Sequence, residues 1–204
     1  QLLIEEKENV SWKSICNNIP KAVLSFALKS CTNGLNTPDN LKRWGIRKMD
    51  TCVLCKNRGT LEHTLNYCSV ALNQGRFTWR HNSVLAHFTT ELKKHKSNHI
   101  EIYADLPSHN INGGTIPQDI TQTALRPDLV LIERKAKKIH LLELTCSFET
   151  NIDAAYHRKY KNYTDLKSDL ENSEWAVQLY PFEIGSRGHV TKRNKDTLMK
   201  TARH

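Results

Sequence analysis

Residues 126–145 have the sequence RPDLVLIERKAKKIHLLELT, in which a basic segment separates two apolar runs. The runs, Leu129–Glu133 and Ile139–Cys146, have the length of buried strands. The residues between them, Arg134–Lys138, are polar and few enough to form a tight turn. This stretch therefore predicts a β-hairpin that opens the second half of the chain.

Two acidic residues lie at the ends of the predicted hairpin. Asp128 begins the first run, and Glu143 is near the end of the second. Because a hairpin brings its open ends together, both carboxylates can reach one ion. Carboxylates suit hard ions such as Mg²⁺ and Mn²⁺, and such an ion makes water nucleophilic for phosphodiester cleavage. The pair is the candidate catalytic site.

A helix expected over Asn151–Glu171 offers the basic group that such a site needs. Position 145 is Thr145, which cannot orient or deprotonate water as a lysine would. Lys159 falls within the apolar stripe of the helix, whereas Lys161 points nearly opposite. A lysine on a core-facing side needs a partner, and Glu143 with a bound phosphate would provide one. Lys159 is thus the candidate catalytic lysine; the alternative is that all three charged groups have structural roles.

A second motif has the spacing of a zinc site: Cys52-x2-Cys55-x7-His63-x4-Cys68. Zinc prefers thiolate and imidazole ligands in a tetrahedron, and about one helical turn separates His63 from Cys68. Four protein ligands leave no open position, so the predicted site is structural. His81 and His87 are nearby ligands that could replace one member. The alternative is a set of buried cysteines and a surface histidine without metal.

The periodicity of the chain changes near residue 96. Residues 1–96 have helical spacing and include the motif at 52–68, so we expect a helical zinc-knuckle module there. In the second part, 97–204, residues 97–125 include a polar stretch at 107–123 and are expected as a linker or flexible loop. The hairpin, a helix and a strand at Trp175–Leu179 follow. A basic helical tail follows. This order predicts a mixed α/β domain.

Composition and charge favour a nucleic-acid partner. The chain has 30 Lys and Arg against 21 Asp and Glu, a net charge of +9 and a pI near 9.3. A polyanion, most simply nucleic acid, suits this balance. The sequence shows no basic amphipathic helix with aromatic anchors, so a membrane surface is not favoured as the partner. The apolar runs are too short to span a bilayer. Cysteines without a pairing pattern fit a reducing compartment.

Several segments resemble, in the same order, the C-terminal restriction-like endonuclease region of site-specific non-LTR retrotransposon proteins. They are Cys52–Cys68 with Thr60-x2-His63, Arg80-His81, Arg126–Val130, Glu143–Thr145, Ala155-x2-Arg158-Lys159, Tyr163-x2-Leu166 and Gly185–Gly188. Relatives often have a second lysine just before the tyrosine that matches Tyr163. Here that position is Asn162, which leaves open whether Lys161 assists or replaces Lys159.

The resemblance implies a PD-(D/E)XK restriction-endonuclease-like α+β core with a mixed central sheet, preceded by a helical module with a CCHC zinc knuckle. It implies that Asp128 and Glu143 bind Mg²⁺ or Mn²⁺ and that Lys159 is the displaced motif lysine. The backbone carbonyl of Leu144 is a further expected ligand of that ion. The implied cofactors are therefore a structural zinc ion and a catalytic Mg²⁺ or Mn²⁺ ion.

The implied activity is that of an endodeoxyribonuclease in target-primed reverse transcription. The enzyme nicks double-stranded chromosomal DNA in the nucleus, and the new 3′-hydroxyl primes copying of the element RNA by an upstream reverse transcriptase domain. Four basic residues are expected to grip phosphates: Arg126, Arg158, Lys161 and Arg187. The alternatives are a non-catalytic zinc-stabilised nucleic-acid-binding module of a larger protein, or a structural adaptor that docks through Phe77 and Trp79.

Overall fold

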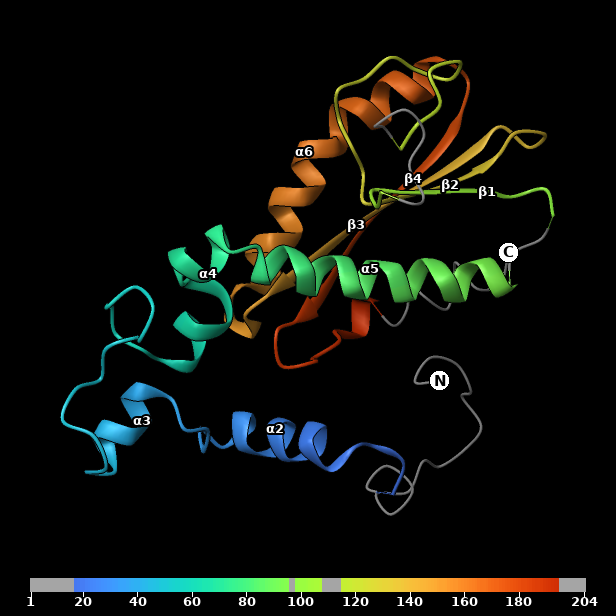
Figure 1. Cartoon of the computed structure of the whole chain (residues 1–204). Coiled ribbons are helices and arrows are strands. Elements are labelled where there is room, and N and C mark those ends of the chain that lie inside the picture. The colour runs from blue at the N-terminus through green and yellow to red at the C-terminus, as the bar shows by residue number, and fades with distance from the viewer. Residues whose placement is uncertain (1–16, 96–97, 108–114, 195–204) are drawn as a thin grey trace. The chain divides into compact units, whose positions relative to one another are not determined.

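The computed structural model describes residues 17–95, 98–107 and 115–194, which belong to two compact units (Figure 1). Unit 1 contains the chain up to Gln74 and the segment from Ser186 onward, and unit 2 is Gly75–Gly185. Helix α5 (Arg76–His95) belongs to unit 2, although its residues are part of the predicted module 1–96. The division into functional domains at 1–96 and 97–204 stays a prediction.

Unit 1 is built from short helical segments. Helix α2 (Lys21–Cys31) follows Pro20, and helix α3 (Pro38–Arg43) begins at Thr37, whose hydroxyl accepts a hydrogen bond from the Asn40 backbone N–H at 3.3 Å. A hydroxyl at the N-cap followed by proline is a common helix start. Unit 1 also contains a π-helical turn, η1 (His63–Tyr67), and helix α4 (Ser69–Asn73).

Unit 2 contains a four-stranded sheet with the order β1-β2-β3-β4. The strands are β1 (Glu101–Ala104), β2 (Leu129–Glu133), β3 (Lys138–Ser147) and β4 (Ala176–Gly185). Strands β1, β2 and β3 are antiparallel neighbours, whereas β4 runs parallel to β3. A parallel pair needs a crossover, which is provided by a short 3-10 turn, η2 (Glu149–Asn151), and helix α6 (Ile152–Asn172). The predicted mixed α/β architecture with a mixed sheet is confirmed.

Helices α5 and α6 cover opposite faces of the sheet. Along a strand, alternate side chains point to opposite faces. One face packs on Tyr163, Leu166 and Leu170 of α6 in a buried cluster, with Ile116, Val130, Ile132, Ile139, Leu141 and Val177. On the other face, Phe182 of β4 stacks on Phe88 of α5, with ring centroids 5.6 Å apart. The sheet is thus buried on both sides, and its core strands are continuous apolar runs.

Two segments differ from the expectations. Thr115–Pro117, within the expected linker, is buried, and Ile116 is part of the core of unit 2. Strand β4 continues through Pro181 beyond its expected end at Leu179, because an edge strand tolerates proline. The expected C-terminal helix lies mostly outside the described residues. None of the helices in the described ranges combines the length and the apolar character that crossing a membrane requires.

Candidate functional site

The hairpin of β2 and β3 brings Asp128 and Glu143 together. Asp128 precedes β2, and Glu143 follows Leu142, the register partner of Leu129. Glu143 Oε1 accepts a hydrogen bond from the Asp128 backbone N–H at 3.0 Å, and Asp128 Oδ2 accepts one from the Leu144 backbone N–H at 2.8 Å. Both residues are buried, with 9% of Asp128 and 1% of Glu143 exposed. These reciprocal bonds fix two carboxylates at one end of the hairpin.

Lys159 reaches this pair from α6. Its Nζ donates a hydrogen bond to Glu143 Oε2 at 2.6 Å and lies 4.0 Å from Asp128 Oδ2. Burial and then repulsion by the Asp128 carboxylate raise the pKa of Glu143, and the Lys159 ammonium opposes that rise. Three charged groups from separate parts of the sequence therefore converge, whereas Lys161 is exposed. Their roles in catalysis stay predictions.

His81 of α5 is a fourth group at this site. The sequence analysis gives it as a spare zinc ligand and within the Arg80-His81 segment of the resemblance, but assigns it no role beside the carboxylates. Its Nε2 lies 3.3 Å from Asp128 Oδ2 and 3.2 Å from the Leu144 carbonyl oxygen. Burial lowers the pKa of His81, but the hydrogen bond to Asp128 and the charge of that carboxylate outweigh burial and raise it. The sequence does contain one hint: His81 is four residues before the buried Leu85, on the same helix face.

Two further side chains support the backbone around the carboxylates. Arg80 donates from Nη2 to the Cys146 carbonyl at 3.2 Å, which ties α5 to the end of β3. The Tyr163 hydroxyl donates to the Arg126 carbonyl at 3.2 Å, which ties α6 to the segment before Asp128. Burial raises the pKa of Tyr163, and the Glu143 charge adds to that shift. The hydroxyl is therefore a donor that stays protonated.

The four basic residues expected to grip phosphates have different surroundings. Arg158 and Lys161 are exposed on α6. Arg126 is exposed and forms an ion pair with Asp105. Arg187 belongs to unit 1, where its Nη1 donates to the Ser30 carbonyl at 3.2 Å. Arg158 and Lys161 share one helix with Lys159, whereas Arg187 contributes to the structure of its own unit.

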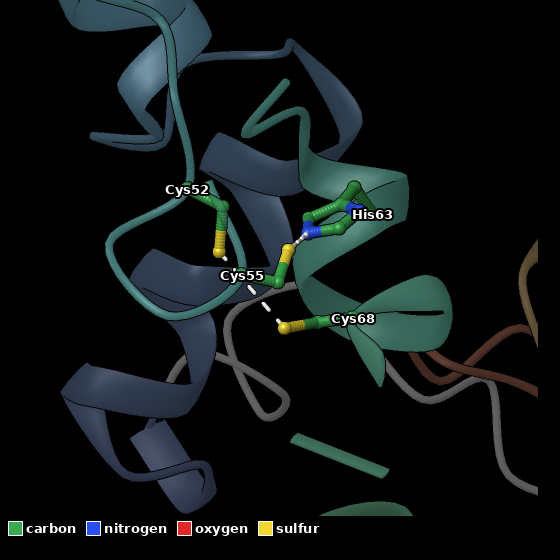
Figure 2. A group of neighbouring side chains, drawn as sticks. All are labelled: Cys52, Cys55, His63 and Cys68. Atoms are coloured by element: carbon green, nitrogen blue, oxygen red, sulfur yellow. Dashed lines mark hydrogen bonds between the residues drawn. The ribbon is translucent and has the colours of Figure 1, made fainter. Parts of the chain in front are cut away.

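The zinc motif forms a compact cluster in unit 1 (Figure 2). The ligand atoms of Cys52, Cys55, His63 and Cys68 all lie within 4.8 Å of one another. The Sγ atoms of Cys52 and Cys68 are 3.9 Å apart, and Cys55 Sγ is 3.1 Å from His63 Nε2. With Zn–S bonds of about 2.3 Å, a tetrahedral ion separates two sulfurs by about 3.8 Å. The four residues fit a tetrahedral zinc ion.

Local backbone structure prepares these ligands. The loop from Cys52 to Cys55 closes through the Lys56 backbone N–H, which donates to the Cys52 carbonyl at 3.1 Å. The π-helical turn places His63 and Cys68 on one side, with the Cys68 N–H donating to the His63 carbonyl at 2.9 Å. Burial alone would raise the pKa of Cys52, but nearby backbone N–H groups and His63 lower it to about 6. A thiolate is the form that binds zinc.

Comparisons with known proteins agree with this zinc site. Residues 1–74 match the family model described as zinc-binding in reverse transcriptase, and the match includes all four ligands but ends before the carboxylate pair. The match and the geometry together identify a zinc-binding module of reverse-transcriptase-related type in this part of the chain. No curated protein matches the chain. The N-terminal domain of a reptarenavirus L protein is similar over 88% of this chain and 80% of that chain, with 13% identity and a TM-score of 0.41.

Proposed function

We propose that the protein is a Mg²⁺- or Mn²⁺-dependent DNA endonuclease that nicks target DNA to prime reverse transcription of a non-LTR retrotransposon. The observation that carries the proposal is the convergence of Asp128, Glu143 and Lys159. Asp128 immediately precedes β2, Glu143 is in β3 and Lys159 is in α6. Both carboxylates have an oxygen within 4.0 Å of Lys159 Nζ. In the PD-(D/E)XK arrangement that we propose for unit 2, two carboxylates and one lysine form the active site.

The residues at this site suit a hard divalent cation. Asp128 and Glu143 would hold the ion through carboxylate oxygens, and Leu144 through its backbone carbonyl, since such ions prefer oxygen ligands. Burial and repulsion between the carboxylates raise the pKa of Glu143, so a cation between them would relieve that repulsion. A bound Mg²⁺ or Mn²⁺ ion would supply an activated water and neutralise charge on the phosphate.

The chain's own groups would position the reactants. Lys159 Nζ is fixed by Glu143 and can direct a second N–H toward a water or a phosphate oxygen, where it would stabilise negative charge as it develops. Hydrolysis adds one water across the P–O3′ bond, which leaves a 5′-phosphate and a 3′-hydroxyl. Arg158 and Lys161, exposed on the same helix, would bind backbone phosphates without reading sequence.

The proposed partners follow from the zinc module. A zinc-binding region that matches the reverse-transcriptase type supports a longer protein with a reverse transcriptase domain upstream. The element RNA would be the template, and chromosomal double-stranded DNA would be the target. The proposed site of action is therefore the nucleus.

A second candidate is a non-catalytic, zinc-stabilised module that binds nucleic acid within a larger protein. It is favoured by the family match, which covers the zinc ligands and stops at residue 74. Both candidates predict DNA binding that weakens as salt rises, because phosphate contacts release counterions. Only the endonuclease predicts cleavage that requires a divalent cation and Asp128.

Nicking of supercoiled plasmid distinguishes the two candidates. Zinc-loaded wild type should nick the plasmid with Mg²⁺ or Mn²⁺ and should be inactive in EDTA. Asp128→Ala should lose cleavage and keep DNA binding, whereas Asp165→Ala, which removes an exposed carboxylate of α6, should behave as wild type. A folded wild type that binds DNA and never cuts it would favour the non-catalytic module.

A further inference from the structure

The imidazole of His81 has no part in the function proposed above, yet it contacts two of the residues that would hold the ion. Its Nε2 is 3.3 Å from Asp128 Oδ2 and 3.2 Å from the Leu144 carbonyl oxygen. His81 is partly buried, with 24% of its side chain exposed. It therefore reaches the candidate site from α5, on the face of the sheet opposite to α6.

The groups around this imidazole are hydrogen-bond acceptors. The Nδ1 atom is 3.1 Å from Asn82 Oδ1, while a carboxylate and a carbonyl oxygen face Nε2. In the tautomer that donates Nδ1–H to Asn82, the lone pair of Nε2 faces the Asp128 carboxylate and the Leu144 carbonyl oxygen. Lone pairs that face one another repel, so this tautomer requires a cation between Nε2 and the two oxygens. That cation is either a proton on Nε2 or a metal ion shared by all three atoms.

The distances and the second ring nitrogen suit a metal ion. In an octahedral site with metal–ligand distances of about 2.1 Å, neighbouring ligand atoms are about 3.0 Å apart. The two separations from His81 Nε2, 3.3 and 3.2 Å, are close to such edges. Ligating histidines commonly donate their other ring N–H to an oxygen, which fixes the tautomer, and Asn82 Oδ1 is in that position.

We infer that His81 Nε2 is a ligand of the catalytic ion, beside Asp128 and the Leu144 carbonyl, and that it makes the site prefer Mn²⁺ to Mg²⁺. This inference rests on the ion site of the proposed function. Mg²⁺ is a hard ion that selects oxygen, whereas imidazole nitrogen suits first-row transition ions better. A site with oxygen ligands alone would have a weaker preference for Mn²⁺.

Pulsed electron paramagnetic resonance of the Mn²⁺-loaded protein tests this ligand directly. The zinc site is first filled with zinc, so that the His63 imidazole does not bind manganese. The wild type should show nitrogen-14 coupling to Mn²⁺, and His81→Gln should not. Glutamine suits a helix and offers an oxygen near the place of Nε2, so the variant should retain an ion site.

Ion affinities provide the second readout. His81→Gln should weaken Mn²⁺ binding by about tenfold or more, and Mg²⁺ binding by much less, as measured by titration. His87→Gln is the matched control, because His87 is an exposed histidine of the same helix. It should leave both affinities and the nitrogen coupling unchanged.

The outcomes separate this inference from the proposed function. If Asp128→Ala abolishes Mn²⁺ binding but the wild type shows no nitrogen coupling, the ion site stands and His81 is not a ligand. His81 is likewise excluded as a ligand if His81→Gln keeps the coupling. If Asp128→Ala binds Mn²⁺ as tightly as the wild type, the proposed ion site is wrong, and the role of His81 is overturned with it.

Discussion

Glu143 is a buried carboxylate that accepts hydrogen bonds from the Asp128 backbone and from Lys159. Lys159→Met removes the ammonium and leaves that carboxylate without its cation. The free energy of unfolding should fall by about 1–3 kcal/mol, because a buried charged acceptor loses its donor. Urea denaturation measures this loss, and Lys167→Met, at a half-buried position of the same helix, is the control.

The same variant tests the role of Lys159 in cleavage. Removal of a group that stabilises transition-state charge typically lowers the rate by about 10²- to 10³-fold. We expect that loss for Lys159→Met, measured as the single-turnover rate of plasmid nicking in Mn²⁺. The opposite pattern, with cleavage lost in Lys161→Met and kept in Lys159→Met, would transfer the role to Lys161.

At the residue scale, local periodicity predicts some contacts and not others. Helical spacing alone predicts that Lys159 faces the core, because the apolar residues that define the core-facing side belong to the same helix. The contact of His81 with Asp128 and Leu144 depends on the packing of α5 against the sheet, which no local pattern encodes. The hint from Leu85 indicates that His81 faces the interior but does not identify what it meets there.

At the scale of elements, the pairing of β1 with β2 is reinforced by a surface ion-pair network. Arg134 donates to Glu101 at 2.7 Å and to Asp119 at 2.6 Å, and its hydrogen bond lowers the pKa of Glu101. A lowered pKa means that the ionised Glu101 stabilises the fold above its unfolded pKa. That contribution is lost as the pH falls through the lower folded pKa.

Chemical denaturation as a function of pH measures this effect. The stability difference between wild type and Glu101→Gln should be constant above about pH 5 and should shrink below about pH 4. In an Arg134→Met background the pH-dependent part of the difference should become smaller, and the part that remains is due to the Tyr103 hydroxyl, which also donates to Glu101, at 2.7 Å. A difference that is independent of pH in both backgrounds would show that the pair contributes nothing to stability.

Zinc removal is predicted to affect one unit only. The helical segments around the motif are short, and such helices are not stable without tertiary support. A chelator should therefore abolish the hydrogen-exchange protection of α3 and α4 and leave that of β2 and β3 intact. Cys52→Ser should reproduce the effect, whereas Cys31→Ser, at an exposed position outside the motif, should not. Retained protection in α3 and α4 after confirmed zinc loss would contradict this prediction.

Elements with strong local patterns were predictable from the sequence, and those set by tertiary pairing were not. The β2–β3 hairpin and α6 follow from apolar runs, a polar turn and helical spacing. The full length of β4 depends on parallel pairing with β3, which continues from Lys138 to Ser147. The sequence does not predict this continuation, because Pro181 would normally end a strand. Within a strand, proline is tolerated mainly at a sheet edge.

At the scale of the whole molecule, the zinc site and the carboxylate site belong to separate units. The zinc ligands are close in sequence, so their spacing alone predicts the site. The candidate active site draws on α5, β2, β3 and α6, and its completeness therefore depends on the packing of unit 2. The proposed function combines the zinc-binding module of unit 1 with the carboxylate site of unit 2, which we propose to cut DNA.

The most direct measurement of the central claim is extension of the cut strand by a DNA polymerase. Duplex DNA is incubated with zinc-loaded protein and Mn²⁺, and labelled nucleotides and polymerase are then added without any end repair. We predict that nicks made by the wild type are extended at once, because cleavage leaves a 3′-hydroxyl, and that Asp128→Ala yields no extendable ends. Nicks that require phosphatase treatment before extension, or equal extension after incubation with Asp128→Ala, would contradict the account.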